Sequence, residues 1–343
     1  MLNLKYFVAL AVITIVSCDV EIPEKYRNAK PLSEHPKYKE LWQRLYPNIL
    51  ETEKDPFIIG GSPAAPGDIP HFALMFIIFP QDIVYICGGS IINPKWVLTV
   101  TFCIDRDANN FNIYTGIVNI SGPATWGTAA SHSDMHVHPQ YNASALRNDI
   151  ALVNLVNAPN DLLSKPYVGM IQLPTQPVNL VDFLGSISGF GQTSDNSSYA
   201  SNVLKQNSLR VITNVRCSAY YVVGAIDDTH ICAEANATAS ACGGDNGGPF
   251  SIVTNGVNRL EGIISFFAQS GCTRGYPVGF TRVSSYLRWI NDTINGRNPN
   301  DELWDNLRDL QEQYLNTLQI IIEGASARKK EKLLKALKLK VLL

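Results

Sequence analysis

Hydrophobic residues between positions 58 and 296 fall into short runs that are separated by glycine, proline and asparagine. The clearest runs are FALMFIIF (72–79), SIINPKWVLTV (90–100), IALVNLV (150–156) and RLEGIISFF (259–267). Runs of this length, broken by residues that favour turns, are typical of the strands of a β-barrel or β-sandwich. A last stretch, SSYLRWINDTI (284–294), indicates a closing helix. The pattern predicts one all-β domain over residues 58–296.

The segments on either side of this domain have a different pattern. Residues 19–57 are polar, contain five prolines and no cysteine, and are predicted to be a propeptide or linker with a short helix through 37–46. From residue 297 apolar positions recur every three or four residues, which predicts a helical extension over 297–343. Its last part, 328–343, carries seven Lys or Arg and one Glu. Such a helix suits weak binding to an anionic membrane surface or an acidic partner, or it is a solvated end.

The first 18 residues have the order of a cleaved secretory signal. Lys5 precedes an apolar run from Tyr6 to Val16, and the small residues Ser17 and Cys18 follow. The run is too short to span a bilayer, although a signal anchor is the alternative. The sequence therefore predicts a secreted, extracellular protein.

Cysteine and charge content fit that location. The chain has 28 Lys and Arg against 30 Asp and Glu, so no net field points to nucleic acid. Six cysteines remain after Cys18, an even set that predicts three disulfides but, by spacing alone, no particular pairing. Glycosylation sequons begin at Asn119, Asn142, Asn196, Asn236 and Asn291.

The sequence offers little support for a metal site, and no cofactor is expected. It has no cysteine pair or cysteine–histidine spacing of the zinc-binding kind. Asp134, His136 and His138 alternate, so on a strand they would share one face and could bind a metal. A structural role without a metal is the other interpretation, and we predict no metal.

Five segments occur in the order in which chymotrypsin-like serine proteases carry them. They are IIGGSPAAPGDIP (58–70), CGGSIINPKWVLTVTFC (87–103), NDIALV (148–153), GGDNGGPF (243–250) and TRVSSYLRWI (281–290). On these segments, residues 58–294 resemble the trypsin family. The resemblance implies two antiparallel six-stranded β-barrels of the chymotrypsin type with a C-terminal helix, followed here by the helical extension.

The residues that carry catalysis in that family are only partly present. The family uses a serine nucleophile, a histidine that takes up its proton and an aspartate that orients the histidine. Asp149 matches the aspartate, but Phe102 stands at the histidine position and Asn246 at the serine position. A phenyl ring cannot accept a proton, and an amide is no substitute for an activated hydroxyl. The resemblance therefore implies an inactive homologue.

The resemblance also assigns the neighbouring structural positions. The backbone amides of Gly244 and Asn246 match the oxyanion-hole donors, where a glycine turn required by the backbone is the simpler interpretation. Family pairing would join Cys87 with Cys103, Cys217 with Cys232, and Cys242 with Cys272.

The specificity pocket and the activation switch differ from the family pattern. Ser240 matches the pocket base, whereas Phe267 and Val278 stand where the family has glycines, which predicts a narrowed or closed pocket. Ile58 and Asp245 match the two ends of the activation switch, in which a new N-terminal amine pairs with a buried carboxylate. Phe57 replaces the usual basic residue before the cleavage site, so Asp245 either serves that switch or only shapes the turn.

These features favour a secreted protein that acts by binding other extracellular proteins, such as active serine proteases or their inhibitors. It would be a protease cofactor, a regulator or an inhibitor decoy. Two alternatives are a serine-type endopeptidase-like hydrolase with residual activity and a membrane-active protein that acts through its cationic tail.

Overall fold

The computed structural model describes residues 20–38, 61–195, 197–236, 239–267, 271–297 and 312–313. The chain divides into two compact units, Met1–Asn291 and Asp292–Leu343. Most described residues of the second unit belong to the end of α3 (Leu287–Ile294) and the turn after it, and residues 312–313 are helical. The signal sequence, most of the helix expected at 37–46, and nearly all of the predicted C-terminal extension lie outside the described residues. Within the described part, no helix is long and apolar enough to cross a bilayer.

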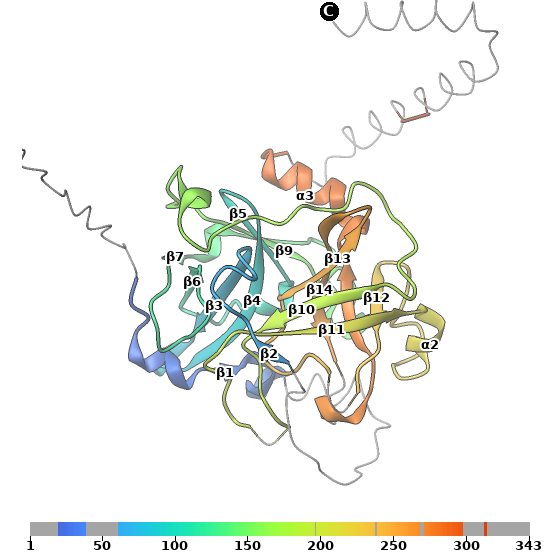
Figure 1. Ribbon diagram of the computed structural model, residues 1–343, viewed down its shortest axis with the longest axis horizontal. Coiled ribbons are helices and arrows are strands. Elements are labelled where there is room, and N and C mark those ends of the chain that lie inside the picture. The colour runs from blue at the N-terminus through green and yellow to red at the C-terminus, as the bar shows by residue number, and fades with distance from the viewer. Residues whose placement is uncertain are drawn as a thin grey trace, which may run out of the picture. The chain divides into compact units, whose positions relative to one another are not determined.

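The first sheet is built from the N-terminal half of the domain (Figure 1). Its strands are β3 (Phe72–Ile78), β4 (Val84–Asn93), β5 (Trp96–Thr99), β6 (Asn110–Thr115), β7 (Trp126–Ala130), β8 (Met135–Val137) and β9 (Ala151–Asn154), in the order β7-β6-β3-β4-β5-β9-β8. A short strand, β1 (Lys30–Pro31), pairs in parallel with β4.

The second sheet closes on itself. It contains β10 (Leu184–Gly189), β11 (Lys205–Ile212), β12 (His230–Ala233), β13 (Pro249–Thr254), β14 (Val257–Phe266) and β15 (Val278–Arg282), with β2 (Ser62–Pro63) added beside β11. Pairing of β10 with β11 completes a barrel of six strands. The short helix α2 (Asn214–Ser218) follows β11.

The chymotrypsin-type all-β fold expected from the sequence is confirmed, with one difference between its halves. The second sheet is a closed barrel of six strands, as expected. Among the described residues, the two end strands of the first sheet do not pair with each other, so this sheet is a half-barrel. Its end strand β8 has only three residues, which limits the ladder that it can form.

The apolar runs read from the sequence become the buried strands. Phe72, Leu74 and Phe76 of β3 form one apolar cluster with Phe190 and with Tyr26 from the N-terminal segment. Burial on both faces explains why β3 is a continuous apolar run, because a strand with one wet face would alternate. The N-terminal segment therefore contributes to the core of the first sheet.

Candidate active site

The three disulfides join the cysteines that family pairing implied, and two of them hold segments that carry site residues. The bonds are Cys87–Cys103, Cys217–Cys232 and Cys242–Cys272. The first fixes the 3₁₀ turn Thr101–Cys103, which carries Phe102, to β4. The third fixes the loop before Asn246 to the turn before β15.

Asp149 lies just before β9 and is buried, with 5% of its surface exposed. Its Oδ1 accepts a hydrogen bond from the backbone N–H of Phe102 at 2.9 Å, and its Oδ2 accepts one from the Ser265 hydroxyl at 2.6 Å. Burial raises the pKa of the Asp149 carboxyl to about 6, although these hydrogen bonds oppose the rise. The carboxyl is thus held by a backbone amide and a hydroxyl.

Phe102 occupies the position where the family carries its base. Its side chain is buried, and the ring of Tyr38 meets it edge-on with centroids 4.6 Å apart. The phenyl ring has no atom that accepts a proton from a nucleophile. It supplies aromatic contact at this position instead.

Asn246 points its amide at the strand that carries Ser265. The Nδ2 group donates to the backbone oxygen of Ser265 at 2.7 Å, and the backbone oxygen of Asn246 accepts from Gly88 N–H at 2.7 Å. Its Oδ1 is buried, and no donor among the described residues reaches it. Ser265 therefore connects Asn246 to Asp149, a link that the motifs alone did not reveal. The one available signal was its position as a polar residue inside the apolar stretch GIISFF (262–267).

The glycine loop keeps a geometry that only glycine adopts easily. Gly244, the other oxyanion-hole position, has φ of +96°, and Gly247 has φ of +82°. A Cβ on Gly247 would lie 2.2 Å from the backbone oxygen of Gly88. These values support the structural interpretation of the glycines, since the backbone requires them whatever the chemistry.

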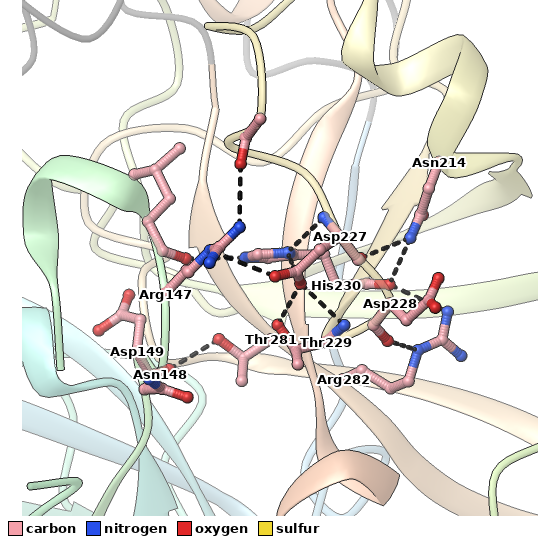
Figure 2. Close-up of polar contacts among 12 residues, drawn as sticks. Arg147, Asn148, Asp149, Asn214, Asp227, Asp228, Thr229, His230, Thr281 and Arg282 are labelled. Atoms are coloured by element: carbon pink, nitrogen blue, oxygen red, sulfur yellow. Dashed lines mark hydrogen bonds and ion pairs between the residues drawn. The ribbon is translucent and has the colours of Figure 1, made fainter. Parts of the chain in front are cut away.

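A polar network that runs from exposed Arg147 to buried His230 positions the loop before Asp149 (Figure 2). The Arg147 guanidinium pairs with Asp227 at 3.2 Å, and Asp227 in turn contacts His230 Nδ1 at 3.0 Å. His230 Nε2 lies 2.7 Å from the backbone oxygen of Leu146, and since that oxygen can only accept, Nε2 carries the proton. His230 is 2% exposed with both ring nitrogens engaged, so its role here is to hold the loop.

The far side of this network reaches β15. Arg282 donates to the backbone oxygens of Asp228 and His230, and Thr281 donates to the backbone oxygen of Asp149 at 2.7 Å (Figure 2). The backbone of Asp149 is therefore anchored to the second barrel while its side chain reaches into the site.

The pocket positions predicted from the sequence lie in two environments. Phe267 and Val278 are buried in the apolar cluster of the second barrel, with 8% and 0% of their surface exposed. The Ser240 hydroxyl donates to the backbone oxygen of Ala241 at 2.9 Å. Ser240 also borders a small cavity, open to solvent, whose lining includes neither of the two large side chains.

That cavity is shared with Asp245. The carboxylate of Asp245 accepts hydrogen bonds from the backbone N–H groups of Cys242 and Gly191, at 2.9 and 2.7 Å. Burial raises its pKa to about 6. The partner expected from the sequence, Ile58, lies outside the described residues, whereas Gly61 lines the cavity. The position thus suits a cationic group beside a buried carboxylate.

The alternating Asp134, His136 and His138 have other partners than a metal. Asp134 accepts from Ser131 in a turn, while the rings of the two histidines contact aromatic side chains. Among the described residues, the group with ligand spacing is Asp195 with Cys242 and Cys272, whose sulfurs form a disulfide. That bond removes the thiolates that a metal would need.

The sequons that the structure describes lie on the surface. The asparagines at 119, 142, 236 and 291 are exposed, and Asn196 lies outside the described residues. Glycosylation of these sites stays a prediction.

Comparison with known proteins agrees with the fold. A family model described as Trypsin matches residues 58–290. Brachyurin of Leptuca pugilator is 36% identical over 233 residues, which are 68% of this chain and 96% of that protein. Collagenase of Hypoderma lineatum is 33% identical over 237 residues, which are 68% of this chain and 85% of that protein. The solved structure of HL collagenase has a TM-score of 0.59 and 31% identity, and the match covers 70% of this chain and all of that one.

Proposed function

Since the chain belongs to the trypsin family of serine proteases, we propose that it is a secreted, non-catalytic member that acts by binding other proteins. The observation that carries the proposal is the pair of substitutions at Phe102 and Asn246. Peptide hydrolysis in this family needs a base to take a proton from the nucleophile, and neither side chain does either task.

The surroundings of the two residues support the same conclusion. Asn246 directs its amide to the backbone of Ser265, and the Asp149 oxygens are bound by Ser265 and by the Phe102 amide. Loss of the base or of the nucleophile leaves at most about 10³–10⁴-fold catalysis over water from the remaining site. Retained disulfides and glycine turns would preserve a rigid scaffold, as expected for a role in recognition.

The proposed partners are extracellular proteins, in particular active serine proteases or their inhibitors. A domain with the backbone of a protease offers surfaces that such proteins already recognise, so it can act as a cofactor, a regulator or a decoy. The three disulfides support an oxidising, extracellular location.

The proposal is tested with a serine-directed fluorophosphonate and a panel of peptide substrates. We expect the wild-type protein to take up no label and to release no product above buffer. Covalent labelling at the active-site loop, or turnover that survives repurification and tracks the protein, would overturn the proposal. An active trypsin-family protease serves as the positive control for both reagents.

A further inference from the structure

Residues 20–38, here called the arm, enter the site from the β4 side. The arm pairs in parallel with β4, where Lys30 lies opposite Tyr85 and Pro31 opposite Ile86. Ile86 is itself a neighbour of the glycine loop, because a Cβ on Gly244 would lie 3.0 Å from the Ile86 side chain. Pro31 of the arm is thus paired with a residue that neighbours the oxyanion-hole position Gly244.

The next residues of the arm lie against the glycine loop. A Cβ built on Gly243 would be 2.9 Å from the Ser33 hydroxyl and 3.0 Å from Cβ of Pro31. Glycine at this position therefore lets the arm approach the backbone closely. Leu32, between these two contacts, is completely buried.

The arm ends on Phe102, at the other side of the site. Tyr38 places its ring on Phe102 and donates its hydroxyl to Asp105 at 2.6 Å. Lys37 pairs with Asp105 at 3.1 Å and with Asp107 at 2.8 Å. The arm therefore contacts both the glycine loop at Gly243 and the position where the family carries its base, Phe102.

The buried Asp105 carboxylate depends on the arm for its hydrogen bonds. Its side chain is fully shielded from solvent, so its charge depends on the donors around it. Burial alone would raise the pKa of Asp105, but hydrogen bonds from Tyr38, from the Asp107 amide and from Lys37 outweigh burial and lower it. Two of these three donors come from the arm.

The preceding turn anchors the arm to the first sheet. Ile22, Tyr26 and Ala29 are buried in the cluster that contains Phe72 and Phe76. The Tyr26 hydroxyl accepts a hydrogen bond from Asn112 at 2.5 Å, and its ring lies 4.6 Å from that of Phe76. Residues 19–57 contain no cysteine, so the arm has no disulfide to the domain.

We infer that the cleft between β4, Gly243 and Phe102 is a peptide-binding groove, and that its occupant is the chain's own arm. The groove takes Pro31 at the end of β1 and the 3₁₀ turn Leu32–Glu34, with the apolar Leu32 in the buried position and Tyr38 at the acidic end. Held by burial and pairing, the arm stays bound after a cut between residues 39 and 57 and keeps the groove closed to other peptides.

The test uses the full chain with a recognition sequence for a site-specific protease inserted after Asn48. After cleavage, size-exclusion chromatography at micromolar concentration, with mass spectrometry of each fraction, reports whether the arm elutes with the domain. We expect the wild-type arm to remain with the domain. Elution of the wild-type arm as a free peptide would overturn the inference.

A matched pair of variants shows whether the groove is specific. Leu32→Asp places a charge in the buried position and should weaken retention of the arm by about 100-fold. Asn28→Asp adds the same charge at an exposed position of the arm and should leave retention unchanged. Equal retention of the two variant arms would contradict the groove.

Two further measurements apply if Leu32→Asp does not fold. In the first, a fluorescent peptide of residues 20–38 should replace the bound arm of the cut protein and reach saturation. In the second, the peptide should replace a Tyr38→Ala arm about 10-fold faster than the wild-type arm, because the variant arm loses the Phe102 contact and the hydrogen bond to Asp105. Equal exchange rates for the wild-type and Tyr38→Ala arms would overturn the inference.

Discussion

Asp149 is a buried carboxyl with two neutral hydrogen-bond donors and no positive partner among them. The pKa rises from the ordinary 3.8 to about 6 because burial disfavours the charge. A carboxyl whose pKa is raised by folding contributes stability that is complete below pH 3.8 and is lost as pH rises through about 6. At neutral pH the buried negative charge of Asp149 therefore lowers the stability of the folded domain.

Asp149→Asn measures that cost. A rise of the pKa from 3.8 to about 6 corresponds to about 3 kcal/mol between the two protonation states. Between pH 4 and pH 7.5, the free energy of unfolding of the wild type should fall by about 2.5 kcal/mol more than that of the variant, because the first part of these roughly 3 kcal/mol is lost below pH 4. Denaturant unfolding with intact disulfides checks this. The Asp245 contribution is common to both proteins and cancels, so parallel pH profiles would contradict the assignment.

Ser265 is predicted to matter mainly through this carboxyl. Ser265→Ala removes the donor to Asp149 Oδ2 and should cost about 1–3 kcal/mol at pH 7.5, and less at pH 4, where the carboxyl is neutral. Ser90→Ala is the control, since the buried Ser90 hydroxyl has no partner among the described residues. Chemical denaturation of both variants at the two pH values separates the effects, and equal losses would count against the link.

At the scale of elements, the closed second barrel depends on how tightly β14 and β15 approach. Gly279 of β15 faces the Phe266 ring, and a Cβ there would lie 2.0 Å from a ring carbon. The ring cannot move freely, because it also contacts Tyr221 and His230 with centroids 5.0 and 5.7 Å away. This position has no room for a side chain.

Gly279→Ala should therefore destabilise the domain by about 1–3 kcal/mol through overpacking. Gly122→Ala is the matched control, since its Cβ would meet nothing closer than 3.4 Å. Thermal unfolding of both variants tests the expectation. A change at Gly122 as large as that at Gly279 would show that the loss of glycine, and not the Phe266 contact, is responsible.

The strands could be predicted from the sequence because their apolar runs are local. FALMFIIF became β3 with one residue left over, and RLEGIISFF contains most of β14. Docking of the arm could not be predicted in this way, since it depends on contacts between residues such as Tyr38 and Phe102, which are far apart in the chain. Prolines favoured a linker there, whereas Ile22, Tyr26 and Leu32 form buried contacts.

The site shows the same division between what is local and what is not. The positions of Phe102, Asp149 and Asn246 follow from motifs that each lie in one short stretch. The bridge through Ser265 and the direction of the Asn246 amide arise only when β14 meets the glycine loop. A motif fixes which residue stands at a position, and the fold decides which atoms that residue meets.

For the molecule as a whole, we expect the arm to limit access to the site even after the family's histidine and serine are restored. In the double variant Phe102→His with Asn246→Ser, a fluorophosphonate should react at least about 10-fold faster when the arm also carries Leu32→Asp than when it carries Asn28→Asp. The measurement is the rate of covalent labelling by mass spectrometry. Equal rates in the two backgrounds, including no labelling in either, would contradict a covering role for the arm.

The amide of Asn246 also bears on how the protein could change over evolutionary time. Serine at position 246 would take away the hydrogen that now satisfies the buried Ser265 oxygen, at a cost of about 1–3 kcal/mol. Reactivity would still require a histidine at position 102. Under the proposed non-catalytic role, Asn246→Ser alone therefore lowers stability and brings no gain in activity, so selection on single substitutions would keep the asparagine.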